Sequence, residues 1–277
     1  MNFFIFIVNR LIIWYNPYDL KLKRIIAMNI FKKIARALTS KAARECKRYY
    51  TSAIIVAAGK STRTSGNVPK QLMLIKGIPV IVRTMLAFQN CPLINEIIIV
   101  AAPDEIKEYE GFRRKYGISK LSAVTIGGKT RSESVISGFA AVSQKCEFVA
   151  IHDGARCLIK PEDIEKVVKS AFRYGSAIMA SRSTDTLKKV DKNGIITDTV
   201  DRDTVMRAQT PQVFMKEVYQ IAISSDKKPA MPTDDSMLAE SAGFKVHIVE
   251  AGAYNIKITT DEDFYVAEKI IANGGTE

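Results

Sequence analysis

The sequence predicts an α/β fold, namely a doubly wound, mostly parallel sheet with a projecting β-hairpin arm. Three observations support this prediction. Short β-branched runs alternate with segments of helical period, the strand-like runs are apolar throughout, and the stretch from Asp185 to Asp201 departs from this rhythm with a hairpin pattern. Strands that alternate regularly with helices form parallel sheets, and strands that are covered on both faces are uniformly apolar.

The expected strands and helices follow one another from residue 52 onward. Strands are predicted at Ala53 to Val56, Glu96 to Val100, Ala123 to Ile126, Phe148 to Ile151 and Ala177 to Ala180. Between them, apolar residues three and four positions apart predict helices at Val80 to Gln89, Ser132 to Ser143 and Pro161 to Tyr174. Three further helices are predicted near Lys216 to Ser224, Asp234 to Ala242 and Asp261 to Asn273. The last of these begins with two threonines followed by acidic residues, which suit a helix amino terminus.

The arm is the one segment that does not fit a helix-covered sheet. Two strand-like stretches flank Lys192, Asn193 and Gly194, and the Asn-Gly pair supplies the positive φ of a tight turn. Because its flanks are too polar for a core, the arm should project, over about residues 182–206. A projecting hairpin is stabilised by packing on another subunit. The sequence therefore predicts a homodimer with exchanged arms, and an arm that folds back onto its own chain is the alternative.

The length allows one large domain or two small ones. Because the sequence after residue 51 shows no internal repeat and no low-complexity linker, a single domain is expected over residues 52–277, after a leader at residues 1–51. Of the 277 residues, 47% are hydrophobic and 25% are charged, which excludes disordered, collagen-like and disulfide-scaffold classes. The net charge of +12 is concentrated in residues 1–50, which hold eleven Lys or Arg and two acidic residues. Since a nucleic-acid-binding domain carries its basic excess on the folded body, we expect no nucleic-acid partner.

The leader has several interpretations. Its apolar start is interrupted by Asn9 and Arg10, so it is shorter than the roughly 20 residues of a membrane-spanning helix. It lacks the basic start and cleavage site of a secretory signal. From Met28, apolar residues recur at helical spacing among lysines and arginines. This pattern fits a poorly ordered leader, an amphipathic helix in weak contact with an anionic membrane surface, or less well a transit peptide; Met28 is also an alternative start.

The cysteines and histidines limit the chemistry. Four cysteines, at positions 46, 91, 146 and 157, show no C-x-x-C spacing, so reduced thiols and a cytoplasmic location are expected. With only His152 and His247 in the chain, a His-rich metal site is excluded. Both histidines are interpreted as structural.

A candidate phosphate-binding loop follows the first strand. Ala57, Ala58 and Gly59 allow the backbone to approach a ligand, and Arg63 and Lys70 can flank a polyphosphate. The loop lacks the second glycine of a dinucleotide fingerprint and the first glycine of a P-loop. An ordinary glycine-containing turn with surface cations remains the alternative for the loop considered alone.

Together with six later motifs, this loop resembles the 2-C-methyl-D-erythritol 4-phosphate cytidylyltransferase family. The family pattern A-A-G-x-G-x-R-M-G followed by P-K-Q corresponds to AAGKSTRTSGNVPKQ, with Ser61 and Thr64 as departures. The later motifs are GGKTRSESV at Gly127 to Val135, HDGAR at His152 to Arg156, TVDRD at Thr199 to Asp203, QTPQ at Gln209 to Gln212, TDD at Thr233 to Asp235 and NIKIT at Asn255 to Thr259. The resemblance covers the body of the chain and none of the leader.

The resemblance implies a nucleotidyltransferase fold and a cytidylyl transfer from CTP to methylerythritol phosphate. A phosphate oxygen of the acceptor attacks the α-phosphorus of CTP, and pyrophosphate leaves. Because this nucleophile is already an anion, no strong general base is needed, and catalysis consists of positioning and charge neutralisation. The resemblance further implies that Arg63 and Lys70 stabilise the transition state, and that Arg202 on the arm and Lys257 hold the acceptor for attack.

Other site residues are carried over from the same motifs. Asp153 resembles the family's catalytic aspartate and is the candidate ligand of Mg²⁺ or another divalent cation, with phosphate oxygens and water as the other ligands. Arg156, Thr186 and Thr210 are expected to contact the acceptor substrate. The residues implied in CTP binding are Ala57, Ala58, Gly59, Arg63, Lys70, Gly127, Gly128, Ser134, Asp153 and Lys257, among which the two adjacent glycines and the serine resemble the cytosine-reading segment.

Two alternative functions remain at this point. A CDP-ribitol-forming cytidylyltransferase would use ribitol 5-phosphate, but it usually lacks the DRD of the arm and carries NLKIT in place of NIKIT. A non-enzymatic protein at the membrane surface would explain the basic leader but would not explain the positions of Arg63, Lys70 and Lys257.

Overall fold

The computed structural model describes residues 49–59, 69–252 and 254–274. The predicted leader lies almost wholly outside these residues, as do Arg63 and most of the candidate phosphate loop. Within the described part of the chain, no helix has the length and apolar character needed to cross a membrane.

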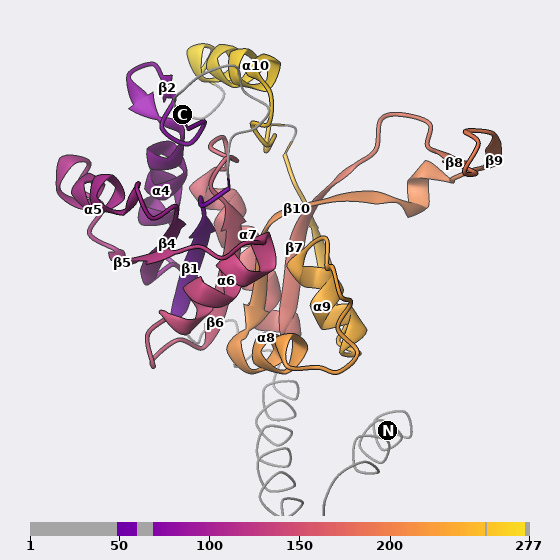
Figure 1. Cartoon of the computed structure of the whole chain (residues 1–277), viewed down its shortest axis with the longest axis horizontal. Coiled ribbons are helices and arrows are strands. Elements are labelled where there is room, and N and C mark those ends of the chain that lie inside the picture. Colours follow the sequence, from indigo (N-terminus) through magenta and orange to yellow (C-terminus); the bar gives the residue numbers. More distant parts are fainter. Residues whose placement is uncertain (1–48, 60–68, 253, 275–277) are drawn as a thin grey trace, which may run out of the picture. The chain divides into compact units, whose positions relative to one another are not determined.

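One seven-stranded sheet forms the centre of the fold (Figure 1). The strand order is β11-β7-β10-β6-β1-β4-β5. All neighbouring pairs are parallel except those of β10, which is antiparallel to both β6 and β7. The strands are β1 (Thr51–Val56), β4 (Glu96–Ala101), β5 (Leu121–Ile126), β6 (Phe148–Asp153), β7 (Ser176–Arg182), β10 (Met206–Met215) and β11 (His247–Glu250). The predicted fold class is thereby confirmed.

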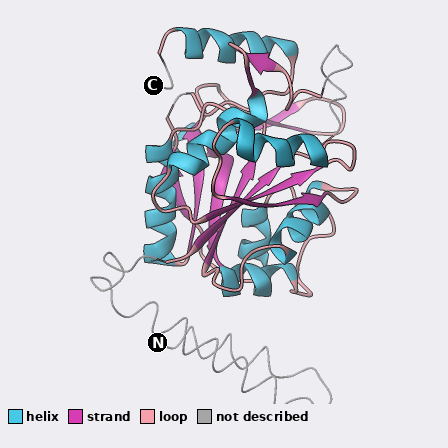
Figure 2. Ribbon diagram, turned by 90° about the vertical axis from the view of Figure 1, so that its left-hand side faces the viewer, coloured by secondary structure: helices cyan, strands magenta, loops and turns pink. Residues whose placement is uncertain are grey.

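Helices cover both faces of the sheet (Figure 2). One face packs on α4 (Val80–Asn90), α5 (Ile106–Lys115) and α7 (Pro161–Tyr174), and the other packs on α6 (Arg131–Ala140), α8 (Lys216–Ile223) and α9 (Asp235–Ser241). The two-residue period of a strand explains this division. In β1, Ala53 and Ile55 face the first core, whereas Ile54 faces the second. Strands buried on both sides are uniformly apolar for this reason.

A third, smaller core lies beside the loops that follow the strands. It joins α10 (Asp261–Ala272) to residues of the β6–α7 connection, to Ile75 of the short strand β2 (Leu74–Ile75) and to Val80, which begins α4 directly after β3 (Ile78–Pro79). The expected cap of α10 is present. Thr260 accepts a hydrogen bond from the backbone amide of Asp263, and the Asp263 carboxylate accepts one from the amide of Thr260. This helix thereby holds the segment that contains Lys257 against the body.

The predicted hairpin is present as β8 (Lys188–Val190) and β9 (Ile196–Thr199), and Figure 1 shows it extending beyond the sheet. Every residue of the two strands is exposed. The turn differs in detail from the expected one. Of the Asn-Gly pair only Gly194 has a positive φ, of 81°, and the loop is closed by a hydrogen bond from the Asp191 amide to the Ile195 carbonyl. The connection is therefore longer than a two-residue turn.

Gly138 offers a test of the packing between α6 and the sheet. A Cβ atom at this position would lie 2.5 Å from Ile54 Cγ2 and 2.8 Å from Val100 Cγ2. Gly138→Ala should therefore lower the free energy of unfolding by about 1–3 kcal/mol, measured by urea denaturation. The matched control is Gly111→Ala on α5, where nothing lies within 4 Å of the added atom, so that the higher helix propensity of alanine should raise stability by up to ~1 kcal/mol. Equal stability of Gly138→Ala and the wild type would contradict this account.

Candidate active site

The described starts of the loops after β1, β5 and β6 lie together at the carboxyl ends of these parallel strands. Val56 is paired with Asp153 at the ends of β1 and β6. The Gly154 amide donates to the Val56 carbonyl at 2.9 Å, and the Gly127 amide donates to the Ala101 carbonyl at 2.9 Å. This edge is where open α/β sheets bind their ligands.

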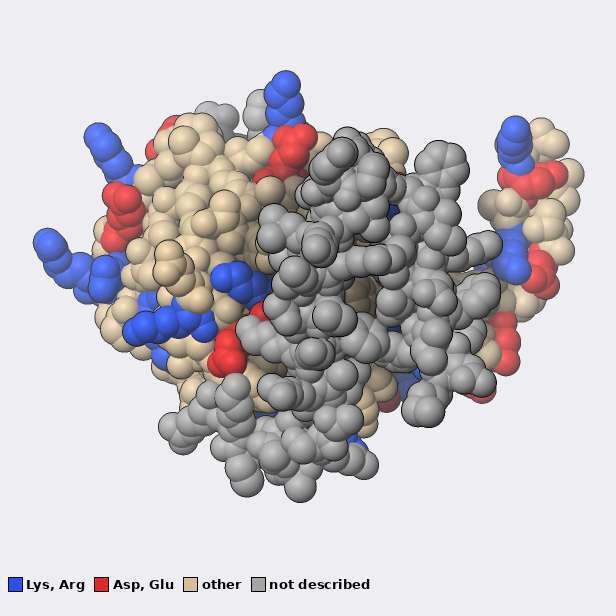
Figure 3. Space-filling model, turned by 90° about the horizontal axis from the view of Figure 1, so that it is seen from below, with Lys and Arg blue, Asp and Glu red and all other residues tan. Residues whose placement is uncertain are grey.

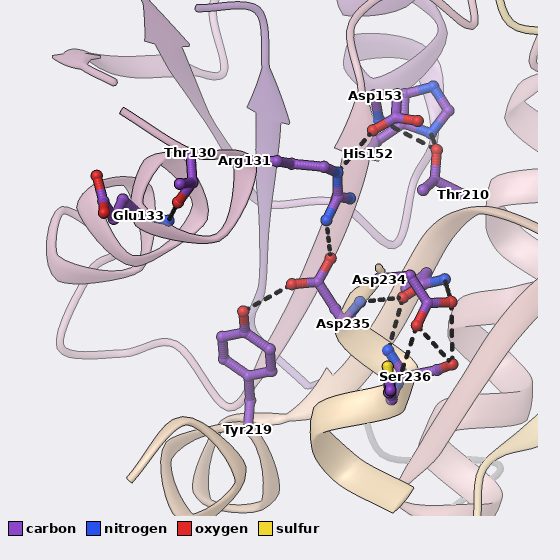
Figure 4. A network of polar contacts seen from close by, with 12 residues as sticks. Thr130, Arg131, Glu133, His152, Asp153, Thr210, Tyr219, Asp234, Asp235 and Ser236 are labelled. Atoms are coloured by element: carbon purple, nitrogen blue, oxygen red, sulfur yellow. Dashed lines mark hydrogen bonds and ion pairs between the residues drawn. The ribbon is translucent and has the colours of Figure 1, made fainter. Parts of the chain in front are cut away.

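Asp153 is the centre of a cationic cluster at this edge, and Figure 4 shows its pair with Arg131. Its Oδ1 lies 3.1 Å from Arg131 Nε, and its Oδ2 lies 2.9 Å from Lys257 Nζ and 3.5 Å from Arg156 Nε. Burial alone would raise the pKa of this carboxyl, but Arg131 and Lys257 hold it well below its usual range. One buried carboxylate thus brings together three cations from three separate parts of the chain.

Behind Asp153, two buried side chains fix its backbone. The Asp153 amide donates to Thr210 Oγ1 at 3.1 Å, and Thr210 Oγ1 lies 3.1 Å from His152 Nδ1. His152 Nε2 lies 3.3 Å from the Arg156 carbonyl oxygen, which can only accept, so Nε2 carries the proton. Burial lowers the pKa of His152 to about 3. His152 is therefore neutral and structural, as the sequence predicts.

Arg131 has a second partner that the sequence analysis does not identify. Arg131 Nη1 lies 2.7 Å from Asp235 Oδ2, and the Tyr219 hydroxyl donates to Asp235 Oδ1 at 2.8 Å. Burial alone would lower the pKa of Arg131, but the negative charges of Asp235 and Asp153 raise it above its usual value. Both Arg131 and Asp235 lie inside recognised motifs, GGKTRSESV and TDD, and this membership is the only signal by which the sequence could have indicated the pair.

The candidate base-reading loop lies directly against the loop after β1. A Cβ atom on Gly127 would be 2.3 Å from Ala58 Cβ. The backbones of the two loops are therefore so close at this point that only glycine fits. Ser134 is buried; its hydroxyl accepts from the Gly128 amide at 3.1 Å and donates to the Thr130 carbonyl at 2.9 Å. Ser134 therefore sets the shape of the loop in this structure.

The remaining predicted residues are distributed around this cluster. Lys70 is half-buried in the turn before β2, and Ala57 is buried, whereas Gly59 is exposed. Arg202 and Thr186 are exposed on and beside the arm, and neither is among the ion-pair or hydrogen-bond partners described for Asp153. Arg156 also donates to the Asn255 carbonyl at 2.9 Å, which ties it to the segment that carries Lys257.

The donor set for a divalent cation is a single carboxylate. No group of three or more His, Cys, Asp or Glu side chains with metal-ligand spacing occurs among the described residues. Mg²⁺ is commonly held by one or two carboxylates together with substrate phosphates and water. Asp153, buried and anionic at the ligand-binding edge, fits that limited role.

The chain is similar to known proteins over most of its length. Residues 51–273 match the family model described as 2-C-methyl-D-erythritol 4-phosphate cytidylyltransferase. A protein of that name from Caldanaerobacter subterraneus subsp. tengcongensis is 42% identical over 220 residues, which cover 78% of this chain and 96% of the relative. Another, from Syntrophus aciditrophicus, is 38% identical over 79% of this chain and 94% of the relative.

Solved structures give the same result. The crystal structure of 4-diphosphocytidyl-2C-methyl-D-erythritol synthase from Anaerococcus prevotii matches with a TM-score of 0.71 and 29% identity, covering 82% of this chain and 98% of that one. The cytidylyltransferase structure from Thermus thermophilus matches with a TM-score of 0.66 and 26% identity, covering 80% and 99%.

Proposed function

The chain belongs to the 2-C-methyl-D-erythritol 4-phosphate cytidylyltransferase family, and on this premise we propose which residues carry the reaction. The enzyme transfers the cytidylyl group of CTP to 2-C-methyl-D-erythritol 4-phosphate in isoprenoid biosynthesis, giving the CDP-alcohol and pyrophosphate. None of the relatives described above is a ribitol phosphate enzyme or a non-enzymatic membrane protein.

The cluster around Asp153 is the observation that supports this site. The acceptor phosphate and the triphosphate are both anions, so they must be brought together against their mutual repulsion. Lys257, with 37% of its side chain exposed, can turn from Asp153 toward a phosphate without leaving the edge of the sheet. Lys70, together with Arg63, would offset the charge that grows on the α-phosphorus and on the departing pyrophosphate.

The acceptor substrate would lie over the other part of the cluster. Arg156 is held by Asp153 and by the Asn255 carbonyl, so its guanidinium has a fixed position from which it can contact a phosphate. Thr210 is only 4% exposed, and its contribution would be to fix the Asp153 backbone. Thr186 and Arg202 would reach the acceptor from the arm.

The nucleotide would bind along the loops after β1 and β5. The backbones at Ala57, Ala58 and Gly59 would cradle the triphosphate. Gly127 and Gly128 would present backbone groups to cytosine, and Ser134 would hold their loop in shape through its hydroxyl. The contact between Gly127 and Ala58 places these two loops side by side, which supports a single nucleotide site rather than two separate ones.

A divalent cation, Mg²⁺ or a similar ion, would be held by Asp153 and by phosphate oxygens. When bound, the cation would neutralise part of the negative charge of the triphosphate. Asp153 already orients Lys257 and Arg131 at this position. The same carboxylate would therefore hold these two side chains and the metal ion.

The remaining assignments concern the whole chain. Residues 52–277 would form the cytidylyltransferase domain, preceded by a leader at residues 1–51. A cytoplasmic location is supported by the unpaired cysteines Cys91, Cys146 and Cys157 in the described residues. The weak membrane contact of the leader stays a prediction.

The arm, about residues 182–206, would exchange between two subunits of a homodimer. Val190, Ile195 and Ile196 are 58%, 62% and 59% exposed, and apolar side chains at an exposed hairpin tip are stabilised by a partner surface. If the partner supplies Arg202, co-expressed Arg202→Ala and Lys70→Ala chains should form mixed dimers with one intact site. Faster pyrophosphate release by the mixture than by either variant alone is the expected result. An inactive mixture of folded dimers would contradict arm exchange.

The function is tested by substrate preference. Purified protein with CTP and Mg²⁺ should release pyrophosphate faster with methylerythritol phosphate than with ribitol 5-phosphate at equal concentration. Faster turnover of ribitol 5-phosphate would overturn the assignment, and vesicle binding without pyrophosphate release would favour the non-enzymatic alternative.

A further inference from the structure

We propose that Arg131 is a positioning residue for cytidylyl transfer, held between Asp153 and Asp235 so that the base-reading loop and the Asp153 cluster keep a fixed relative position. This inference rests on the proposed function. It adds the pair Arg131 and Asp235, neither of which is proposed above to bind a substrate.

The guanidinium of Arg131 bridges two carboxylates. Arg131 uses two different nitrogens for two carboxylates, Nε for Asp153 at 3.1 Å and Nη1 for Asp235 at 2.7 Å. Figure 4 shows its side chain extending from α6 between these two residues. The side chain of Asp235 is 2% exposed and that of Asp153 is 11% exposed, whereas that of Arg131 is 29% exposed, so the carboxylate of each ion pair is shielded from water. The planar guanidinium presents Nε and Nη1 at two fixed positions, whereas lysine has one nitrogen and cannot occupy both positions at once.

Asp235 is itself held in place by the core. Its Oδ1 accepts from the Tyr219 hydroxyl at 2.8 Å, and its backbone amide donates to Gln212 Oε1 at 3.0 Å. Gln212 lies on β10 and is paired with Ile151 of β6, two residues before Asp153. The carboxylate that holds the Arg131 guanidinium is therefore fixed by the sheet and by α8.

Arg131 also connects the base-reading loop to the Asp153–Lys257 pair. Arg131 is the first residue of α6, and Thr130, the N-cap of this helix, ends the loop that begins at Gly127. At the other end, Asp153 uses its second oxygen for Lys257 at 2.9 Å. A displacement of Arg131 would thus move the base-reading loop relative to Asp153 and Lys257. Because misplacement of reacting groups by about 1 Å costs on the order of 10²-fold in rate, this link should affect turnover.

The test uses Arg131→Gln, Arg131→Lys and Asp235→Asn in the full chain. Arg131→Gln should lower kcat by about 10- to 100-fold, with smaller changes in the KM of either substrate. Arg131→Lys should fail to restore kcat, although the charge is kept. Lys169→Gln is the matched control, since it removes the cation of the exposed pair with Glu165 on α7; its kcat should equal that of the wild type.

A double-mutant cycle separates positioning from a structural role. If Asp235 acts on the reaction through Arg131, Asp235→Asn should lower kcat about 10-fold in the wild-type background and cause no further loss in Arg131→Gln. Tyr219→Phe, which removes only a hydroxyl, provides a milder variant should Asp235→Asn fail to fold, and its effect on kcat should likewise vanish in the Arg131→Gln background. A merely structural pair would lower the melting temperature and leave kcat per folded enzyme unchanged.

The outcomes are distinct. Two results with an active wild type would overturn this inference and leave the proposed function intact. One is an Arg131→Gln variant that keeps the kcat of the wild type. The other is an Asp235→Asn or Tyr219→Phe substitution that lowers kcat as much in the Arg131→Gln background as in the wild type. Full activity of Arg131→Lys also overturns the inference, because charge rather than geometry would then be sufficient. A wild type that releases no pyrophosphate from CTP and methylerythritol phosphate overturns the proposed function and this inference together.

Discussion

Lys70→Ala should lower the kcat of pyrophosphate release by about 10²- to 10³-fold. The proposed role of Lys70 is to neutralise charge that develops on the α-phosphorus and the leaving pyrophosphate, and this charge is greatest in the transition state. Binding of CTP should be partly kept, because the backbone around Ala57 to Gly59 and the base-reading loop are unchanged. Steady-state kinetics, together with CTP binding measured by calorimetry, checks both parts of this expectation.

The control for Lys70→Ala is Lys107→Ala. Lys107 is exposed on α5, and this helix packs on the sheet face opposite to α6, so its loss changes the net charge equally without touching the site. If Lys70→Ala retained the kcat of the wild type and only raised the KM for CTP, Lys70 would serve in binding alone, and its proposed catalytic role would be wrong.

Lys257→Ala should have an effect of similar size, a loss of about 10²- to 10³-fold in kcat. Lys257 lies 2.9 Å from Asp153, so its removal also leaves this buried carboxylate with one cation fewer. In contrast to Lys70→Ala, this variant should also raise the KM for methylerythritol phosphate, because Lys257 is proposed to hold the acceptor for attack. The KM values of both substrates, measured separately, distinguish the two lysines.

Lys269→Ala is the matched control for Lys257→Ala, since Lys269 is exposed on the neighbouring helix α10. Its kinetics should equal those of the wild type. A Lys257→Ala variant with normal kcat and normal KM for the acceptor would show that the pair with Asp153 serves stability only.

Much of the fold could be predicted from local patterns. Helix α7 begins with Pro161 at its first position and ends before Gly175, whose φ is 88°, and these boundaries match the expected ones. By contrast, α5 was not predicted, because only Tyr109 and Phe112 are buried in a strongly charged segment. Strand β10 was also not predicted, since it contains a proline, and its exposed half carries polar residues. Its antiparallel pairing depends on partners distant in sequence.

Some residues of the candidate site could likewise be identified from the sequence, and others could not. Asp153 could be identified because it directly follows an apolar strand and lies in a motif. The partners of Arg131 could not be identified, since Asp235 is 104 residues away and no local pattern links the two. The burial of Ser134 and Thr210 likewise comes from packing, which composition and spacing do not encode.

A crystal structure with CTP and methylerythritol phosphate bound most directly tests whether cations at the sheet edge hold two anionic reactants together. We predict that the amines of Lys70 and Lys257 and the guanidinium of Arg63 lie within hydrogen-bond distance of phosphate oxygens, with the acceptor phosphate facing the α-phosphorus. Side chains at these three positions that point into bulk solvent in that complex would contradict the account.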